Sequence, residues 1–395
     1  MTSENVSYIS EAVQQRFVGR NKALELYYLR FAYRHTKNGV YYYGEGGLGK
    51  TWILKKIILD GMGDDPVRTV TDIIDFLDTQ NHTIRGFQSS IKSRLGNPTA
   101  FQPYDEILER LKEVQRKGEE THASVVASLD ARADRLFIEC CKRAIIGREV
   151  VLLFDTFERV QQREVGKWLL DRFLPEVLGL IIVIAGRPGS DSQPAKMPDN
   201  IVTHKLEGLS VEDVEKYIHK RSEDITLDAI KTIQQRTEGT PLLIDLILDL
   251  PEPYRESYIA ELDLQDAGVL IKNSPALQKG LVGQFVDHSK SRNQLIWAMA
   301  YLKRRFDLRT LRYLAEHSKW LRLRDYDEAF AELHKSLYVK EYPEQQSHLL
   351  HDEIQRMVAK WVLEETLDPW MEIRGALYDL VVNRHYPDII QEAET

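Results

Sequence analysis

Runs of strand length alternate with helical segments through the first half of the chain. Five such runs are rich in hydrophobic residues: residues 40–43, 67–76, 149–154, 180–185 and 201–206. Nearly continuous hydrophobic runs are typical of strands in a parallel sheet that is covered on both faces. Helical spacing dominates the first 35 residues and residues 84–146, with a break at Gly96-Asn97-Pro98. The alternation predicts an α/β domain that ends near residue 208.

The second half changes to helices and then to a hairpin pattern. Four segments have helical spacing, the last of them as two short helices: residues 211–219, 227–237, 241–250 and 293–315. Residues 337–340 and 347–350 are strand-like, and Pro343 lies in the polar segment between them. Helices followed by a β-hairpin predict a winged-helix domain.

Composition narrows the class of protein. A chain of 395 residues suits two to four domains. With 43% hydrophobic and 29% charged residues, it has the balance of a soluble globular protein. No apolar run approaches the roughly 18 residues of a membrane span, and the N-terminus does not read as a secretory signal, so no membrane partner is expected. The adjacent Cys140 and Cys141 indicate a reduced, cytoplasmic protein.

Charge and histidine spacing limit the partners further. The formal net charge of -8 argues against a grip on nucleic acid over the whole surface, although a local basic face is compatible with it. The 11 histidines show no paired metal-ligand spacing, so no zinc site is expected.

One segment between a predicted strand and a predicted helix fits the phosphate-loop pattern G-x-x-x-x-G-K-[ST] at every fixed position. It consists of Gly44, Glu45, Gly46, Gly47, Leu48, Gly49, Lys50 and Thr51. The glycines let backbone N–H groups turn toward phosphate oxygens, and the helix N-terminus adds positive dipole. We expect Lys50 to reach the β- and γ-phosphates and Thr51 to offer its hydroxyl to Mg²⁺. With Trp52, which follows directly, the segment predicts an ATPase that binds ATP or ADP.

Two later strand ends carry charged residues suited to the same site. The run at residues 149–154 ends in Asp155, and an acid at this position of a P-loop protein can hold Mg²⁺. A predicted strand separates the loop from this acid along the chain, as in P-loop ATPases with an inserted strand. Arg187 follows the next run and can reach a γ-phosphate; the alternative is an ordinary solvent-facing arginine.

Five motifs follow one another along the chain in the order found in the STAND class of signal-transducing ATPases, and the chain resembles this class, more narrowly its NB-ARC-like members. The phosphate loop and the strand ending at Asp155 are two of them. The other three are Phe17-Val18-Gly19-Arg20, Gly239-Thr240-Pro241 and Leu350-His351-Asp352. The resemblance covers residues 12–362. It implies that the first of these three motifs borders the adenine, that Pro241 packs on the base, that His351 approaches the β-phosphate of ADP, and that Arg187 ends the sensor strand.

The resemblance also organises the chain. It implies an AAA+-like α/β P-loop domain at residues 1–208, a helical domain at 209–288 and a winged helix at 289–366. A helical tail at 367–395 resembles the start of a truncated repeat region, and one such unit cannot bury its own face. We therefore expect either a chain cut from a longer protein or a small switch that takes its sensor and effector from partners.

The sequence departs from the family at two motif positions. Many relatives have a second acid directly after the Walker B aspartate, where this chain has Thr156. Glu158 is the nearest acid that can orient water, and the alternative is a surface carboxylate. Slow hydrolysis is therefore expected, as suits a switch. Leu350 replaces the methionine of the family's M-H-D motif, which conserves volume. Asp352 is expected to cap the helix that follows.

The leading interpretation is a switch that is closed with ADP and assembles into a homo-oligomer with ATP, controlling a signalling or defence effector. The alternative is a DNA-handling ATPase, and a third, disfavoured one is a scaffold with a degenerate site. The DNA-handling alternative rests on a basic stretch formed by Lys303, Arg304, Arg305, Arg309, Arg312, Lys319, Arg322 and Arg324. Such a stretch is also typical of a solvated helix face. The sequence identifies neither the activating signal, nor the effector, nor the oligomer number.

Overall fold

The computed structural model describes most of the first 302 residues and part of the remainder. The described ranges are 13–14, 17–62, 68–117, 123–189, 193–221, 225–266, 268–285, 291–302, 306–307, 338–342 and 347–360, with single positions elsewhere. The chain divides into two compact units. We call residues 6–207 the sheet unit, and residues 208–395 together with 1–5 the helical unit.

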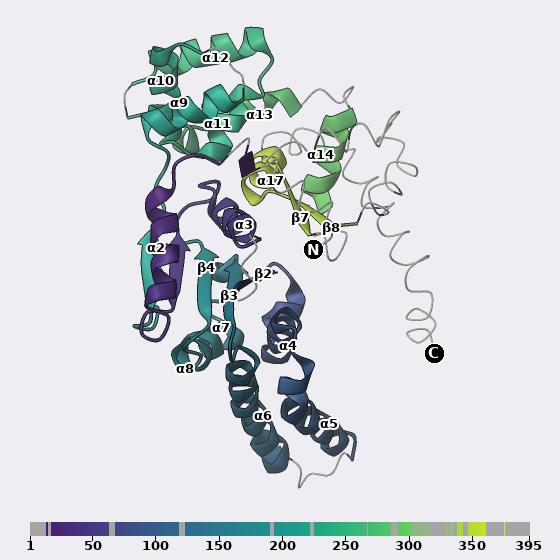
Figure 1. Ribbon diagram of the computed structural model, residues 1–395. Helices are drawn as coiled ribbons and strands as arrows, with labels where there is room; N and C mark the ends of the chain where they lie inside the picture. The colour runs from purple at the N-terminus through teal and green to yellow at the C-terminus, as the bar shows by residue number, and fades with distance from the viewer. Residues whose placement is uncertain are drawn as a thin grey trace. The chain divides into compact units, whose positions relative to one another are not determined.

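A parallel five-stranded sheet forms the centre of the sheet unit, which confirms the predicted α/β fold (Figure 1). Its strands are β1 (Gly39–Tyr43), β2 (Arg68–Asp75), β3 (Glu149–Asp155), β4 (Ile181–Gly186) and β5 (Ile201–Lys205). They lie in the order β2-β3-β4-β1-β5, and every neighbouring pair is parallel. Along the chain, β2 lies between the phosphate loop and Asp155, and it forms an edge of the sheet. Within the sheet, the strand that lies between β1 and β3 is β4.

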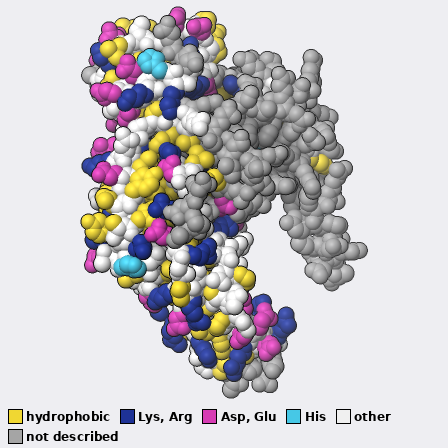
Figure 2. Space-filling model, viewed as in Figure 1, with side chains coloured by type: hydrophobic (Ala, Val, Ile, Leu, Met, Phe, Trp, Pro, Cys, Tyr) yellow, Lys and Arg dark blue, Asp and Glu magenta, His cyan; other side chains and the backbone are white. Residues whose placement is uncertain are grey.

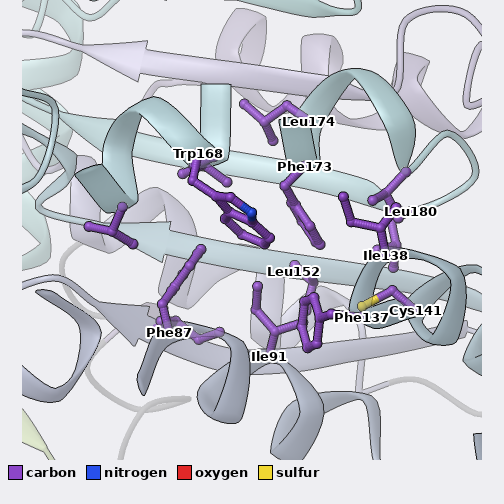
Figure 3. Close-up of a cluster of buried hydrophobic side chains, with 14 of the residues drawn as sticks. Phe87, Ile91, Phe137, Ile138, Cys141, Leu152, Trp168, Phe173, Leu174 and Leu180 are labelled. Atoms are coloured by element: carbon purple, nitrogen blue, oxygen red, sulfur yellow. The ribbon is translucent and has the colours of Figure 1, made fainter. Parts of the chain in front are cut away.

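Helices cover both faces of this sheet, which is why the strand sequences are hydrophobic throughout. On one face, α2 (Asn21–Ala32) and α3 (Lys50–Asp60) pack against Val151 and Leu153 of β3. On the other face, Leu152 and Phe154 pack under α4 (Ile84–Leu95) and the helices that follow. Figure 3 shows this second cluster, in which Phe87, Phe137 and Trp168 surround Leu152.

The helical insert between β2 and β3 begins with short elements and ends in a hairpin of two long helices. After α4 come the 3-10 turn η2 (Pro98–Phe101), α5 (Gln102–Lys117) and α6 (Ala123–Ala144). The predicted break falls where Gly96 closes α4 in a left-handed conformation and Asn97 caps η2. Helices α5 and α6 lie side by side and extend away from the sheet (Figure 1). Lysine and arginine are interspersed with acids on their exposed surface (Figure 2).

Short elements complete the sheet unit. They are η1 (Thr79–His82), η4 (Phe157–Arg159), α7 (Glu164–Trp168), the π-helical turn η5 (Leu169–Phe173) and α8 (Leu174–Glu176). Together with α4 and α6, the segment from α7 to α8 covers the face of the sheet that holds the Leu152 cluster. Across the described ranges, no helix has the length and apolar character needed to cross a membrane.

The helical unit begins with a series of short helices. These are α9 (Val211–Lys220), α10 (Leu227–Thr237), α11 (Pro241–Leu248), α12 (Glu252–Leu264), η6 (Ile271–Asn273), α13 (Pro275–Val282) and η7 (Gly283–Phe285). Ser210, Thr226 and Ser274 each accept a hydrogen bond from a backbone N–H in the first turn of α9, α10 and α13, respectively. Such side-chain caps satisfy donors that the helix itself leaves unpaired, and they mark where the helices start.

An antiparallel sheet follows these helices. Its strands β6 (Phe306–Asp307), β8 (Ser347–Leu350) and β7 (Val339–Tyr342) pair in that order, between α14 (Ser291–Leu302) and α17 (Asp352–Val358). Strands β7 and β8 form the hairpin expected from the sequence. The winged helix itself stays a prediction. Most of the second short helix expected near residue 315, the basic stretch at residues 303–324 and nearly all of the tail lie outside the described residues.

A buried network of charged groups joins three parts of the helical unit. Arg221 donates to Asp245 of α11 at 2.7 Å and to Asp249 at 2.6 Å, and Tyr217 of α9 also donates to Asp245 at 2.8 Å. The Tyr338 hydroxyl, next to β7, donates to Asp249. Burial, and then the nearby Asp249, raises the pKa of the Tyr338 phenol well above its ordinary value, so it remains a donor. The network ties α9 and α11 to the hairpin.

Substituting Arg221 by Met should destabilise the helical unit because it leaves Asp245, whose side chain is 1% exposed, without its counter-charge. We expect the free energy of unfolding, measured with denaturant, to fall by about 3 kcal/mol. This is the lower end of the range for buried pairs, because Arg221 remains 19% exposed. Lys231→Met is the control, because it removes an exposed pair with Asp228 and should cost less than about 1 kcal/mol. Equal losses in the two variants would contradict a stabilising role for the buried network.

Candidate functional site

The phosphate loop connects β1 to α3 and is shaped by its glycines. Gly47 and Gly49 have φ of 80° and 87°, in the left-handed region that favours glycine. A Cβ on Gly44 would lie 2.8 Å from the carbonyl oxygen of Leu206, so this position admits no side chain without a shift. The loop ends at the N-terminus of α3, whose first N–H groups are unsatisfied within the helix. The arrangement is an anion cradle of the kind that binds phosphate.

Lys50 is the first residue of α3 and lies across the loop. Its Nζ donates to the carbonyl oxygens of Gly44 and Glu45, at 2.7 Å in each case. The side chain is largely buried. An ammonium group at this position places a positive charge beside the anion cradle, where it can neutralise a phosphate.

Thr51 and Asp155 are brought together from distant parts of the chain. The Thr51 hydroxyl donates to Asp155 Oδ2 at 2.6 Å. The other carboxylate oxygen of Asp155 accepts the backbone N–H of Thr156 at 2.8 Å, which fixes the carboxylate at the end of β3. A hydroxyl and a carboxylate are the hard oxygen ligands that Mg²⁺ prefers, and Mg²⁺ takes its remaining ligands from water and phosphate. These two residues therefore fit the expected magnesium site.

Thr156 has an unusual conformation directly after Asp155. Its φ of 61° and ψ of 38° are left-handed, which is rare for a β-branched residue. Its hydroxyl is buried and meets no hydrogen-bond partner among the residues that the structure describes. An unpaired polar atom beside the Thr51–Asp155 pair suits a site that keeps bound water. The left-handed turn also starts η4 and thereby directs the next acid, Glu158.

Glu158 and Arg187 form a second pair at the same edge of the sheet. One carboxylate oxygen of Glu158 accepts the backbone N–H of Arg187 at 3.0 Å, and the other lies 3.5 Å from Arg187 Nε. The side chains are 21% and 32% exposed, respectively. Glu158 is thus held at the site and is not an isolated surface carboxylate.

Arg187 also lies against the phosphate loop. A Cβ on Gly46 would meet its guanidinium carbon at 3.3 Å, so glycine at position 46 makes room for the arginine. The hydroxyl of Tyr41 on β1 donates to the Arg187 carbonyl at 3.3 Å. Burial, and then the nearby Glu158, raises the pKa of the Tyr41 phenol above its ordinary value, which keeps it a donor. Sequence reasoning missed Tyr41, because no local pattern marks its long-range contact.

The segment ahead of α2 also contacts the loop. Gly19 and Arg20 are both left-handed, with φ of 62° and 68°. The Arg20 guanidinium donates to the carbonyl of Leu48 at 2.9 Å and also to that of Glu207.

Four further residues predicted for the site belong to the sheet unit: Phe17, Val18, Leu48 and Trp52. Val18 and Leu48 are buried, and Phe17 packs against the cluster that includes Leu48. Trp52 lies in the first turn of α3 with the Lys55 ammonium 4.7 Å from its ring centroid. Their predicted role in holding a nucleotide stays a prediction.

Two predicted site residues belong to the helical unit. Pro241 is the first residue of α11, after the left-handed Gly239. His351 precedes α17, where its backbone N–H donates to the Tyr338 carbonyl at 2.6 Å and its Nδ1 accepts the N–H of Glu353 at 3.3 Å. The expectation that Asp352 caps this helix is wrong: His351 is the capping residue, and Asp352 is already inside the first turn, where its charge suits the helix dipole.

Asp75 is a further acid at this edge of the sheet, and it belongs to none of the sequence motifs. It ends β2 directly beside Asp155, its partner in the parallel register. It is buried, and its Oδ1 accepts the N–H of Leu77 at 2.8 Å. An acid closing a predicted strand was a usable signal, because carboxyl ends of parallel strands share one edge of the sheet.

Comparisons with known proteins establish the fold alone. No protein-family model matches the sequence, and no curated protein matches it. Among solved structures, the chain is similar to a STAND protein (Signal Transduction ATPase with Numerous Domains) with a tetratricopeptide repeat sensor from Pyrococcus horikoshii. The match has 17% identity and a TM-score of 0.53, and it covers 92% of this chain but 45% of that one. The chain thus spans less than half the length of that protein, with which it shares a P-loop ATPase fold.

Two other solved structures superpose more loosely. A Walker-type ATPase of Pyrococcus abyssi has 14% identity and a TM-score of 0.35 over 87% of this chain and 96% of its own. The Orc1 protein of Aeropyrum pernix, in complex with DNA, has 13% identity and a TM-score of 0.39 over 89% of this chain and 95% of its own. Neither match is close enough to refine the description of the fold.

Replacing Thr156 by Gly should be far better tolerated than replacing a threonine in ordinary strand conformation. Glycine adopts a positive φ without strain, and the change also removes a buried unpaired hydroxyl, so the two effects offset the entropy cost of glycine. Thr71→Gly in β2 is the matched control, because Thr71 and Thr156 are equally buried at 5% exposure, and it should cost at least about 1 kcal/mol. We expect Thr156→Gly to change the free energy of unfolding by less than half of that control. Similar losses at both positions would show that Thr156 is not strained.

Proposed function

We propose that the chain is an ATP- and ADP-dependent molecular switch of the STAND class, with slow ATP hydrolysis. The observation that carries this proposal is the Thr51–Asp155 hydrogen bond, which joins a complete phosphate loop to the acid at the end of β3 in the same sheet. In that arrangement the loop N–H groups and Lys50 bind the phosphates. Thr51 and Asp155 would hold Mg²⁺, which when bound would neutralise charge on the phosphates.

Slow hydrolysis follows from the residues around Asp155. The position after it is Thr156, which carries no carboxylate to activate water. Glu158 is the candidate for that role, and it is engaged by both the backbone and the side chain of Arg187. A base held in this way orients water inefficiently, which suits a protein whose bound nucleotide has to persist long enough to report a state.

The switch itself requires the helical unit. We propose that His351 contacts ADP in a closed state and that Pro241 packs on the base, as the family resemblance implies. With Nδ1 accepting from Glu353, neutral His351 carries its proton on Nε2, the nitrogen suited to donate to a phosphate. ATP would favour an open state that assembles into a homo-oligomer. Sensor and effector functions would come from partner proteins or from further domains, as the STAND protein of Pyrococcus horikoshii combines its ATPase with a repeat sensor.

Removing the loop lysine tests nucleotide binding and assembly together. In isothermal titration with Mg²⁺, Lys50→Ala should weaken ATP binding at least about tenfold, because charge-assisted hydrogen bonds to phosphate are lost. Native mass measurement should show oligomers of the parent, but not of the variant, with a non-hydrolysable ATP analogue. Lys56→Ala is the control, since that lysine pairs with Asp60 further along the same helix. Parent-like binding and assembly by Lys50→Ala would refute the proposal.

Removing His351 tests the closed state. A hydrogen bond to a charged phosphate is worth roughly 1.5–3 kcal/mol, so His351→Ala should speed ADP release about ten- to a hundredfold. The oligomeric fraction without added ATP should rise in parallel, because a contact made only in the closed state biases that state. His219→Ala, at an exposed position of α9, is the control. Unchanged ADP release and mass distribution would exclude a latch at His351.

A further inference from the structure

Both carboxylate oxygens of Glu158 contact Arg187, which lies against the phosphate loop. Its two carboxylate oxygens engage one residue, Arg187, through the backbone N–H at 3.0 Å and through Nε at 3.5 Å. The same arginine has its guanidinium against Gly46 of the phosphate loop. One cation thus lies between a fixed carboxylate and the cradle for phosphate.

We propose that Glu158 competes with the γ-phosphate for Arg187 and so determines how strongly the site prefers ATP over ADP. This inference rests on the proposed function, because it assumes that the loop binds adenine nucleotides. A γ-phosphate reaching Arg187 has to displace an existing ion pair. ADP brings no group that far, so its binding leaves the Glu158–Arg187 pair intact. The pair therefore lowers the affinity for ATP selectively.

The geometry allows this exchange without moving the backbone. The Arg187 peptide is held on both sides, its N–H by Glu158 and its carbonyl by Tyr41. The contact between the charged ends is looser, at 3.5 Å, and both side chains keep some exposure to solvent. Rotation of the arginine side chain can then exchange the carboxylate for a phosphate while the main chain of the loop after β4 stays in place.

The partial exposure limits the size of the effect. Partly exposed ion pairs contribute modestly, and the corresponding change in affinity is about two- to fivefold. A selectivity of this size is sufficient to tune a switch, and it is measurable by titration.

A double-mutant cycle tests the competition. The affinities for ADP and for a non-hydrolysable ATP analogue are measured with Mg²⁺ by isothermal titration for the parent, Glu158→Gln, Arg187→Met and the double variant. Glutamine still accepts the Arg187 N–H but carries no charge. Glu158→Gln should bind the analogue about two- to fivefold more tightly and ADP as the parent does. Arg187→Met should weaken the analogue alone, and in its background Glu158→Gln should bring no gain.

The controls separate competition from simpler explanations. Glu164→Gln, at an exposed position in the first turn of α7, removes the same charge from the same unit and should leave both affinities unchanged. A gain from Glu158→Gln that persists with Arg187→Met would mean direct repulsion of the phosphate and would overturn the inference. If the parent binds both nucleotides and Glu158→Gln leaves the ratio of the two affinities unchanged, the inference is also overturned. A parent that binds neither nucleotide would instead overturn the proposed function, and the inference with it.

Discussion

The position of β4 between β1 and β3 is the constraint on which the candidate site depends. All five strands are parallel, so their carboxyl ends meet at one edge of the sheet. That edge receives the phosphate loop from β1, Arg187 after β4 and Asp155 from β3. Because β4 lies between β1 and β3, Arg187 follows its strand at a position between the phosphate loop and Asp155. Its contacts with Gly46 and Glu158 follow from this order, as does the reach of Thr51 to Asp155.

The charged groups at this edge of the sheet are held by hydrogen bonds and by one ion pair. Lys50 is held by loop carbonyls, Asp155 by a hydroxyl and a backbone N–H, and Glu158 by Arg187. Each charged group is thereby oriented within the protein itself. The main chain that carries these groups needs little reorganisation when an anion or cation binds, which is the physical advantage of building such a site on rigid strand ends.

Much of this arrangement was predictable from the sequence because the signals are local. The loop pattern, the apolar strands and the acid closing β3 are each confined to a few consecutive residues, and the parallel sheet follows from their alternation with helices. The pairing of Glu158 with Arg187 depends on which strands become neighbours, and no local pattern contains that information. The cap of α17 was assigned wrongly for a related reason. His351 and Asp352 are both capable of capping, and the backbone contact of His351 with Tyr338 decides where the helix starts.

Arg20 gives the sheet unit a mechanical property. One guanidinium holds the carbonyl of Leu48 in the loop and the carbonyl of Glu207, the last residue of the unit. The positions of these two carbonyls are therefore not independent. A change of loop shape that moves the Leu48 carbonyl must reorient the Arg20 side chain, displace Glu207 or break one of the two hydrogen bonds. The phosphate cradle and the residue at which the sheet unit ends thus share one hydrogen-bond donor group.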